Sequence, residues 1–212
     1  MTRPTHPLPD GFGNWTAHVV HMPLEVLDRM EQAVLKVRER LLRATAALNQ
    51  LGVEYAVVGG HAVASWVARI DEGAIRNTRD VDLLVHRADL SAITAALEQV
   101  GFVAGEVLDV VMFRDGLSGK PSEAVHLLFA NEKLRPEHSL PLPEIKTVTD
   151  PANFPILTLD LLLMMKLLSN RRKDLVHVED MINVGLIDAS WLPKLPSELA
   201  ARLQHILDTP DG

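Results

Sequence analysis

The spacing of apolar residues predicts a long helix near the start of the chain. From Met30 to Leu51, apolar residues recur at steps of three and four, which places them on one face of a helix. Gly52 follows, where a glycine commonly ends a helix. The first 22 residues hold three prolines and two glycines and show no steady periodicity, so residues 1–22 are predicted to form an N-terminal arm.

Strands and helices alternate through the middle of the chain, and helices follow at its end. Five prolines between Pro136 and Pro155 predict an extended connection rather than a regular element. The pattern predicts strands at 55–58, 81–85, 107–114 and 122–129, the last two joined as a hairpin around Asp115–Gly116, and helices at 61–70, 90–100, 158–169, 175–184 and 197–207.

These elements predict an α/β (α+β) fold, in which a mixed β-sheet is flanked by helices and followed by a small helical C-terminal part. The predicted organisation is an arm (1–22), a core with a leading long helix (23–135), a Pro-rich connection (136–157) and a helical C-terminal part (158–212).

Composition narrows the function classes. The 212 residues include no cysteine, which excludes a disulfide scaffold, a Cys-ligated zinc module and a thiol nucleophile. No uncharged run exceeds about 14 residues, too short to span a bilayer, and prolines occupy the N-terminus where a signal peptide needs apolar residues. A cytoplasmic protein without a membrane partner is expected. The net charge of −7 argues against a free duplex-binding module.

Two aspartates at the mouth of a predicted strand are the first candidates for chemistry. Asp80 and Asp82 are two residues apart, so in a strand they point to the same face, about 6.5 to 7 Å from each other. Two ionised carboxylates at that distance repel by roughly 2.5 kcal/mol at an effective dielectric constant of about 20. Either Mg²⁺ or Mn²⁺ bound to their oxygens, or ion pairs with Arg76 and Arg79, would offset this repulsion.

A glycine pair lies one helix upstream. Gly59 and Gly60 follow the strand at 55–58 directly and precede a predicted helix. Glycines let the backbone approach a ligand closely, and a helix N-terminus offers N–H donors to a phosphate. The alternative is an ordinary tight turn.

The runs Val58-Gly59-Gly60-His61-Ala62-Val63-Ala64 and Arg76-Asn77-Thr78-Arg79-Asp80-Val81-Asp82-Leu83-Leu84-Val85 together resemble a known family pattern. They are similar to the DNA polymerase beta-like nucleotidyltransferase superfamily, and most to its small bacterial members of toxin–antitoxin and abortive-infection operons. The helical segments around Met164–Leu168 and Arg172–Leu175 also resemble the C-terminal helices of those proteins, so the likeness covers about residues 53 to 184.

The resemblance implies a nucleotidyltransferase-like fold and a metal-dependent transfer of a nucleoside monophosphate from a nucleoside triphosphate to an acceptor, which would be RNA or protein. A partner protein encoded in the same operon is also expected. Asp80 and Asp82 would bind Mg²⁺ or Mn²⁺ and, with His126, form the catalytic set. The nucleotide-binding residues that it implies are Gly59, Gly60, His61, Arg76, Thr78 and Lys166.

Two positions depart from the family pattern. Members usually supply a third carboxylate from a neighbouring strand, and this chain has Val125-His126-Leu127-Leu128 there. Members also usually have an Asp at the last position of a Lys-Asp-x-x-Asp pattern in the C-terminal helix, and this chain has His177 there. His126 could ligate Mn²⁺, or accept a proton from the attacking hydroxyl. The alternative is a catalytically impaired protein that binds a nucleotide or a protein partner.

Lys166 interrupts an otherwise apolar helical segment. It either extends along the helix to reach the surface or reaches a phosphate. The basic run Arg171-Arg172-Lys173 follows a few residues later and is the best local patch for a nucleotide or RNA acceptor, or else a solvated helix end.

Overall fold

Seven strands of the chain join one mixed β-sheet in the part that a computed structural model describes, residues 24–107 and 110–209. The predicted arm at residues 1–22 lies outside these residues. The strands are β1 (Tyr55–Val58), β2 (Val81–Val85), β3 (Phe102–Val107), β4 (Val110–Asp115), β5 (Val125–Phe129), β6 (Thr147–Thr149) and β7 (Pro155–Leu157). The helices are α1 (Leu24–Leu51), α2 (Gly59–Ala68), α3 (Leu90–Gln99), α4 (Leu159–Ser169), α5 (Arg172–Asn183) and α6 (Ser197–Asp208), with short 3₁₀ helices at Glu72–Ala74, Arg87–Asp89, Pro121–Glu123 and Ala189–Lys194.

The sheet has the order β3-β4-β5-β2-β1-β7-β6. Strand β2 lies near its centre, antiparallel to β1 and parallel to β5. Strand β4 pairs antiparallel with β5, which confirms the predicted pairing around Asp115–Gly116. The α/β class, the mixed sheet and the helical C-terminal part are confirmed.

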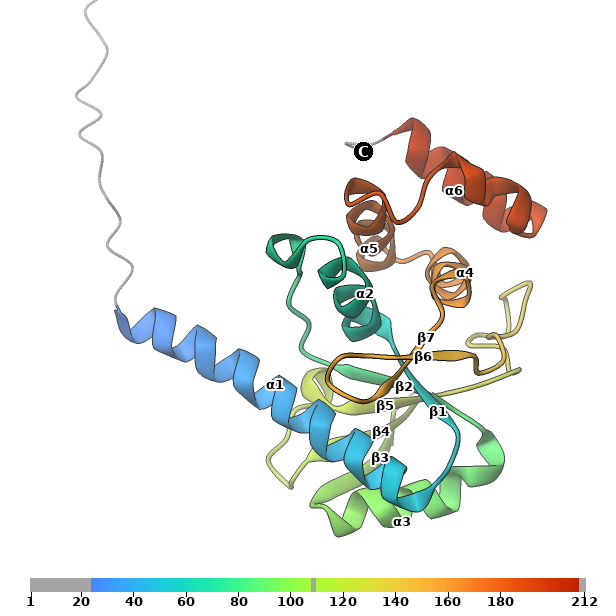
Figure 1. Cartoon of the computed structure of the whole chain (residues 1–212). Coiled ribbons are helices and arrows are strands. Elements are labelled where there is room, and N and C mark those ends of the chain that lie inside the picture. Colours follow the sequence, from blue (N-terminus) through green and yellow to red (C-terminus); the bar gives the residue numbers. More distant parts are fainter. Residues whose placement is uncertain (1–23, 108–109, 210–212) are drawn as a thin grey trace, which may run out of the picture.

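Helices cover both faces of the sheet. Figure 1 shows α3 and the C-terminal half of α1 on one side, and α2, α4, α5 and α6 gathered on the other. Val81, Leu83 and Val85 of β2 are fully buried, because alternate residues of this central strand face the packed helix layer. Asp82 lies between them in sequence and faces the opposite side, where the helices leave a cleft over the sheet.

Helix α1 is buried only in its C-terminal half. Leu41, Ala44 and Leu48 lie in the core, whereas Met30 and Val34 on the same stripe are 56% and 44% exposed. The N-terminal half extends away from the body (Figure 1). The helix and its end at Gly52 are as predicted, but the rest of the domain covers only the C-terminal half of its apolar stripe.

Three strands were not predicted. Strand β3 contains an interior Gly105, which weakens a strand pattern, and it forms through its antiparallel pairing with β4. Strands β6 and β7 lie inside the Pro-rich segment predicted as an extended connection without an element. Pro155 is tolerated because it is the first residue of β7, and β7 adds to the sheet beside β1.

No helix in the described part of the chain combines the length and the apolarity that crossing a bilayer requires.

Candidate metal and nucleotide site

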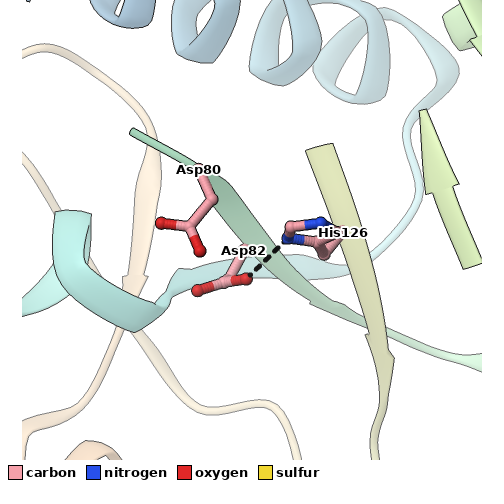
Figure 2. Close-up of side chains that lie close together, drawn as sticks. All are labelled: Asp80, Asp82 and His126. Atoms are coloured by element: carbon pink, nitrogen blue, oxygen red, sulfur yellow. Dashed lines mark hydrogen bonds and ion pairs between the residues drawn. The ribbon is translucent and has the colours of Figure 1, made fainter. Parts of the chain in front are cut away.

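Two neighbouring parallel strands bring three polar side chains together at the centre of the sheet. Asp80 immediately precedes β2, Asp82 is its second residue, and His126 on β5 is the direct register partner of Asp82. Figure 2 shows the three side chains pointing toward one another, with His126 Nδ1 3.3 Å from Asp82 Oδ1. One ligand atom from each residue lies within 4.8 Å of the other two. The position that the family pattern gives to a third acid is therefore held by His126 within the same cluster.

Gly59 makes room for the Asp82 carboxylate. Its φ is +65°, a conformation that favours glycine, and a Cβ added there would overlap the Asp82 side chain. Helix α2 begins at this glycine, two residues earlier than predicted, and no side chain caps its N-terminus. The glycine pair is more than a tight turn: it lets the first turn of a helix, with free N–H groups, approach a carboxylate on the neighbouring strand.

Asp80 is held by two donors. Thr78 Oγ donates a hydrogen bond to Asp80 Oδ1 at 2.8 Å, and Lys173 Nζ lies 3.4 Å from Oδ2. Burial alone would raise the pKa of Asp80, but the Thr78 hydrogen bond and the Lys173 charge outweigh it and lower the pKa. The carboxylate is therefore ionised at neutral pH. Thr78 also lies against Gly60, where an added Cβ would be 2.8 Å from the hydroxyl oxygen.

His126 is protonated more readily than a free histidine. Burial lowers its pKa, but the hydrogen bond that its ring donates to Asp82 and the charges of Asp82 and Asp80 outweigh this and raise it. A cation bound to the carboxylates would offset their charge and so remove one cause of the raised pKa.

The cluster forms the floor of a cavity of about 340 Å³. One wall is the sheet, and the other comes from α4 and the start of α5. The cavity is lined by Gly59, Asp80, Asp82, Val110, Met112, His126, Leu128, Leu134, Leu142, Leu162, Met165, Lys166, Ser169, Arg171, Lys173 and Asp174. A second, more polar cavity shares Asp80 and Lys173 with it. Asp80 therefore lies where the two cavities meet.

The helix wall is organised around one buried acid. Asp174 is 1% exposed, and it accepts hydrogen bonds from Lys166 Nζ at 3.2 Å and from Arg171 Nε at 2.7 Å. Burial alone would raise its pKa, but Arg171 and Lys166 outweigh it and lower the pKa of Asp174 to about 2. Lys166 is 5% exposed, so the prediction that it extends to the surface is wrong. Its amine instead lines the cavity while paired with Asp174.

Four of the six predicted nucleotide-binding residues do not line this cavity. Arg76 donates two hydrogen bonds of 2.8 Å to Asp180 of α5 and lines the second cavity, beside Thr78. His61 lies in the first turn of α2 but faces a small hollow against α1, where its Nε2 is buried without a partner; burial lowers its pKa. Gly59 and Lys166 line the main cavity, whereas Gly60 and Thr78 line the second one.

Three residues of the helix wall were not among the predicted site residues: Arg171, Lys173 and Asp174. Arg171 and Lys173 belong to the basic run that was interpreted as a patch for an acceptor, and Lys173-Asp174 is the start of the helix pattern shared with the family. The Lys-Asp pattern is the sequence feature that could have identified these residues. Their distance from Asp80 in the sequence, 91 to 94 residues, hid the contact between Lys173 and Asp80.

The three side chains fit a divalent cation. Two carboxylates supply hard oxygen donors, which suit Mg²⁺ and Mn²⁺, and an imidazole is better accepted by Mn²⁺. The ligand atoms are close enough to share one ion, and the cluster is partly exposed to the cavity, with 17 to 22% of each side chain accessible. Among the described residues this is the one such group of acids and histidines.

Comparisons with known proteins address the fold. No protein-family model and no curated protein matches the sequence. Among solved structures, the antibiotic-resistance factor ANT(2'')-Ia in solution matches with a TM-score of 0.52 and 13% identity, over 83% of this chain and 93% of that one. A crystal structure of ANT(2'')-Ia with adenylyl-2''-tobramycin matches with a TM-score of 0.50 and 14% identity, over 84% of this chain and 99% of that one.

The chain has the nucleotidyltransferase fold. Its seven-stranded mixed sheet and flanking helices match these neighbours along almost their whole length. An antigenic nucleotidyltransferase-like protein from Paracoccidioides brasiliensis also matches, with a TM-score of 0.48 and 20% identity over 82% of this chain and 90% of that one. At these identities the likeness concerns the fold, and the chemistry must be argued from the side chains of this chain.

Proposed function

We propose that the protein is a metal-dependent nucleotidyltransferase, which moves a nucleoside monophosphate from a nucleoside triphosphate to the hydroxyl group of an acceptor. The observation that carries this proposal is the cluster of Asp80, Asp82 and His126 at the floor of the cavity, within a nucleotidyltransferase fold. Two adjacent carboxyl groups that are open to a cavity suit a cation, and a nucleotide would bring several negative charges to the same place.

Each part of the site has a role in binding the triphosphate. Asp80 and Asp82 would hold Mg²⁺ or Mn²⁺, which when bound neutralises the phosphates and the charge that develops on the leaving pyrophosphate. The uncapped first turn of α2, at Gly59 and Gly60, offers backbone N–H groups to phosphate oxygens. Lys173, half exposed and already beside Asp80, is the cation best placed to contact the phosphates.

The transfer requires that one proton leaves the acceptor. The acceptor oxygen forms a bond to the α-phosphorus, while the bond from that phosphorus to its bridging oxygen breaks and pyrophosphate leaves with the electron pair. His126 is the group that accepts the hydroxyl proton, because it lies in the cluster and is a base once the charge of the carboxylates is neutralised. Asp82 orients the ring through its contact with Nδ1.

A second candidate is a catalytically impaired protein that binds a nucleotide or a protein partner. The observation that favours it is the same histidine: without a cation, His126 and Asp82 form an ion pair that satisfies both groups. The two candidates differ in one property, which is turnover.

The test is the transfer of label from each α-³²P-labelled nucleoside triphosphate, with Mg²⁺ or Mn²⁺, to molecules in a cell extract that has been freed of endogenous nucleotides. Label transfer by the natural chain that is lost in Asp80→Asn and Asp82→Asn, and retained in the exposed control Asp28→Asn of α1, is expected. Absence of transfer with every triphosphate, in both the natural chain and His126→Asp, would refute the enzyme. Transfer by His126→Asp alone would identify the natural chain as the impaired form.

A further inference from the structure

The side of the cavity next to His126 is apolar, and this bears on the acceptor. Met112 on β4 is the register partner of His126, Leu128 is two residues further along β5, and Val110 is two residues before Met112. In a β-sheet, residues paired in register and residues two apart share a face. The base that takes the acceptor's proton thus has apolar side chains on its β4 side, whereas Asp82 lies on its β2 side.

The apolar surface continues away from the carboxylates. Val110 and Leu128 also line an adjoining cavity of about 370 Å³, together with Leu134 and Leu142 of the segment that follows β5. Across the main cavity, Leu162 and Met165 of α4 complete the wall. A molecule whose hydroxyl reaches His126 therefore has its body between aliphatic side chains.

The acids along this path are already paired. Asp174 is bound by Lys166 and Arg171, and Glu132, at the rim of the adjoining cavity, is bound by Arg87 at 2.6 Å. Asp80 and Asp82 are the proposed cation ligands. In the described part of the chain, the remaining charged residues that line the two cavities are the cations Lys173, Lys133 and Arg135.

From this arrangement we infer that the acceptor is a hydroxyl compound with an apolar body, neutral or anionic, and that it is not a polycation. The inference rests on the proposed function, because the transfer defines what an acceptor is. A polycation such as tobramycin, the adenylylated group in one ANT(2'')-Ia structure, would meet bound metal and the cations Lys173, Lys133 and Arg135 here and would find no free carboxylate. An apolar body gains from the burial of aliphatic surface on both walls.

The probe is 2-naphthol, a neutral hydroxyl compound with an apolar body, whose binding to the full chain in the presence of Mg²⁺ and a non-hydrolysable α,β-methylene nucleoside triphosphate is measured by its fluorescence and by calorimetry beside tobramycin. The variant Leu128→Glu places a charge on the apolar wall, and Leu134→Glu does so on a loop that tolerates substitution more readily. The matched control is Leu42→Glu, an apolar residue of α1 that is 37% exposed and outside both cavities. Thermal unfolding confirms that each variant is folded.

We expect 2-naphthol to bind at least tenfold more tightly than tobramycin, and each cavity variant to weaken its binding at least tenfold while the control leaves it unchanged. In the presence of Mn²⁺ and a labelled triphosphate, label should transfer to 2-naphthol and not to tobramycin.

Tighter binding of tobramycin, or equal binding of 2-naphthol by all the variants, would overturn the inference. So would transfer of label to RNA or protein of an extract without any to apolar hydroxyl compounds, although the proposed function would then stand. Binding to the apolar wall without transfer to any acceptor would refute the proposed function and leave the cavity's ligand class established.

Discussion

The two walls of the cleft use charge in opposite ways. On the sheet wall, Asp80, Asp82 and His126 are each about one-fifth exposed and face the cavity. On the helix wall, Lys166 and Asp174 are 5% and 1% exposed and satisfy each other. Charges that face a cavity remain available to a ligand, whereas a buried and closed pair mainly fixes the position of the elements that carry it. The difference separates residues expected to act in binding and catalysis from residues expected to hold the wall in place.

The largest effect is expected on activity, from the sheet wall. Asp82→Asn should lower label transfer at least ~10³-fold, equivalent to about 4 kcal/mol, because a cation ligand and the partner of His126 are lost together. The same change should move the urea midpoint little, since the removed repulsion between two carboxylates offsets the lost contact with His126. A fall in stability that parallels the fall in activity would contradict the assignment of Asp82 to the functional wall.

The next effect is expected on stability, from the helix wall. Asp174→Asn leaves Lys166 buried without its counter-charge and should cost roughly 3–5 kcal/mol of unfolding free energy, measured by urea denaturation. The exposed pair of Arg87 and Glu132 is the control: Arg87→Gln should cost less than about 1 kcal/mol. Because the pKa of Asp174 is lowered to about 2 from 3.8, its contribution is present above pH 4 and lost as the pH falls toward 2. Asp174→Asn should therefore reduce the dependence of the unfolding free energy on pH between about pH 4 and pH 2.

A smaller effect is expected where the walls meet, at the glycine turn. Gly59→Ala adds a Cβ that overlaps Asp82 on a backbone with positive φ, so we expect a loss of about 1–3 kcal/mol and a displaced carboxylate. Gly116→Ala is the matched control, since Gly116 also has positive φ (+70°) but open space around it. Equal losses of stability and unchanged activity in both variants would show that the contact with Asp82 does not matter.

The smallest effect concerns pH and distinguishes the two histidines. Burial and the nearby Lys166 lower the pKa of His177 to about 4, so the unfolded chain binds a proton before the folded one does. Stability should therefore fall as the pH drops from about 6.5 to about 4, and His177→Gln should remove that fall, as followed by urea midpoints. His126 has the opposite sign: its raised pKa gives stability that is complete below pH 6.5 and is lost as the pH rises through the higher pKa of the folded state. A profile of His177→Gln with the same acid slope as the natural chain would contradict this interpretation.

The sheet wall could be predicted from the sequence for a physical reason. Strand periodicity puts Asp80 and Asp82 on one face from their spacing alone, and the family pattern indicated that His126 takes the neighbouring strand. The contact itself required the parallel register of β2 and β5, two strands separated by 39 residues, which no local pattern determines.

The helix wall was harder to predict from the sequence, because a nearly continuous apolar segment does not determine the direction of the Lys166 side chain. Its direction depends on Asp174, which belongs to the next helix. Strands β6 and β7 were missed because each is three residues long, and their place in the sheet depends on the pairing of β7 with the distant β1 and of β6 with β7. The arm at residues 1–22 and the division of the chain into a core and a C-terminal part remain predictions.

The most direct test of the central claim is the binding of Mn²⁺ by the full chain, followed by electron paramagnetic resonance with a non-hydrolysable α,β-methylene nucleoside triphosphate. At least one Mn²⁺ per chain should bind together with the nucleotide. It should be lost in the double variant Asp80→Asn, Asp82→Asn and retained in Asp174→Gln at a temperature at which that variant is folded. Mn²⁺ and nucleotide bound with undiminished affinity by the double variant would contradict a metal site at these two aspartates.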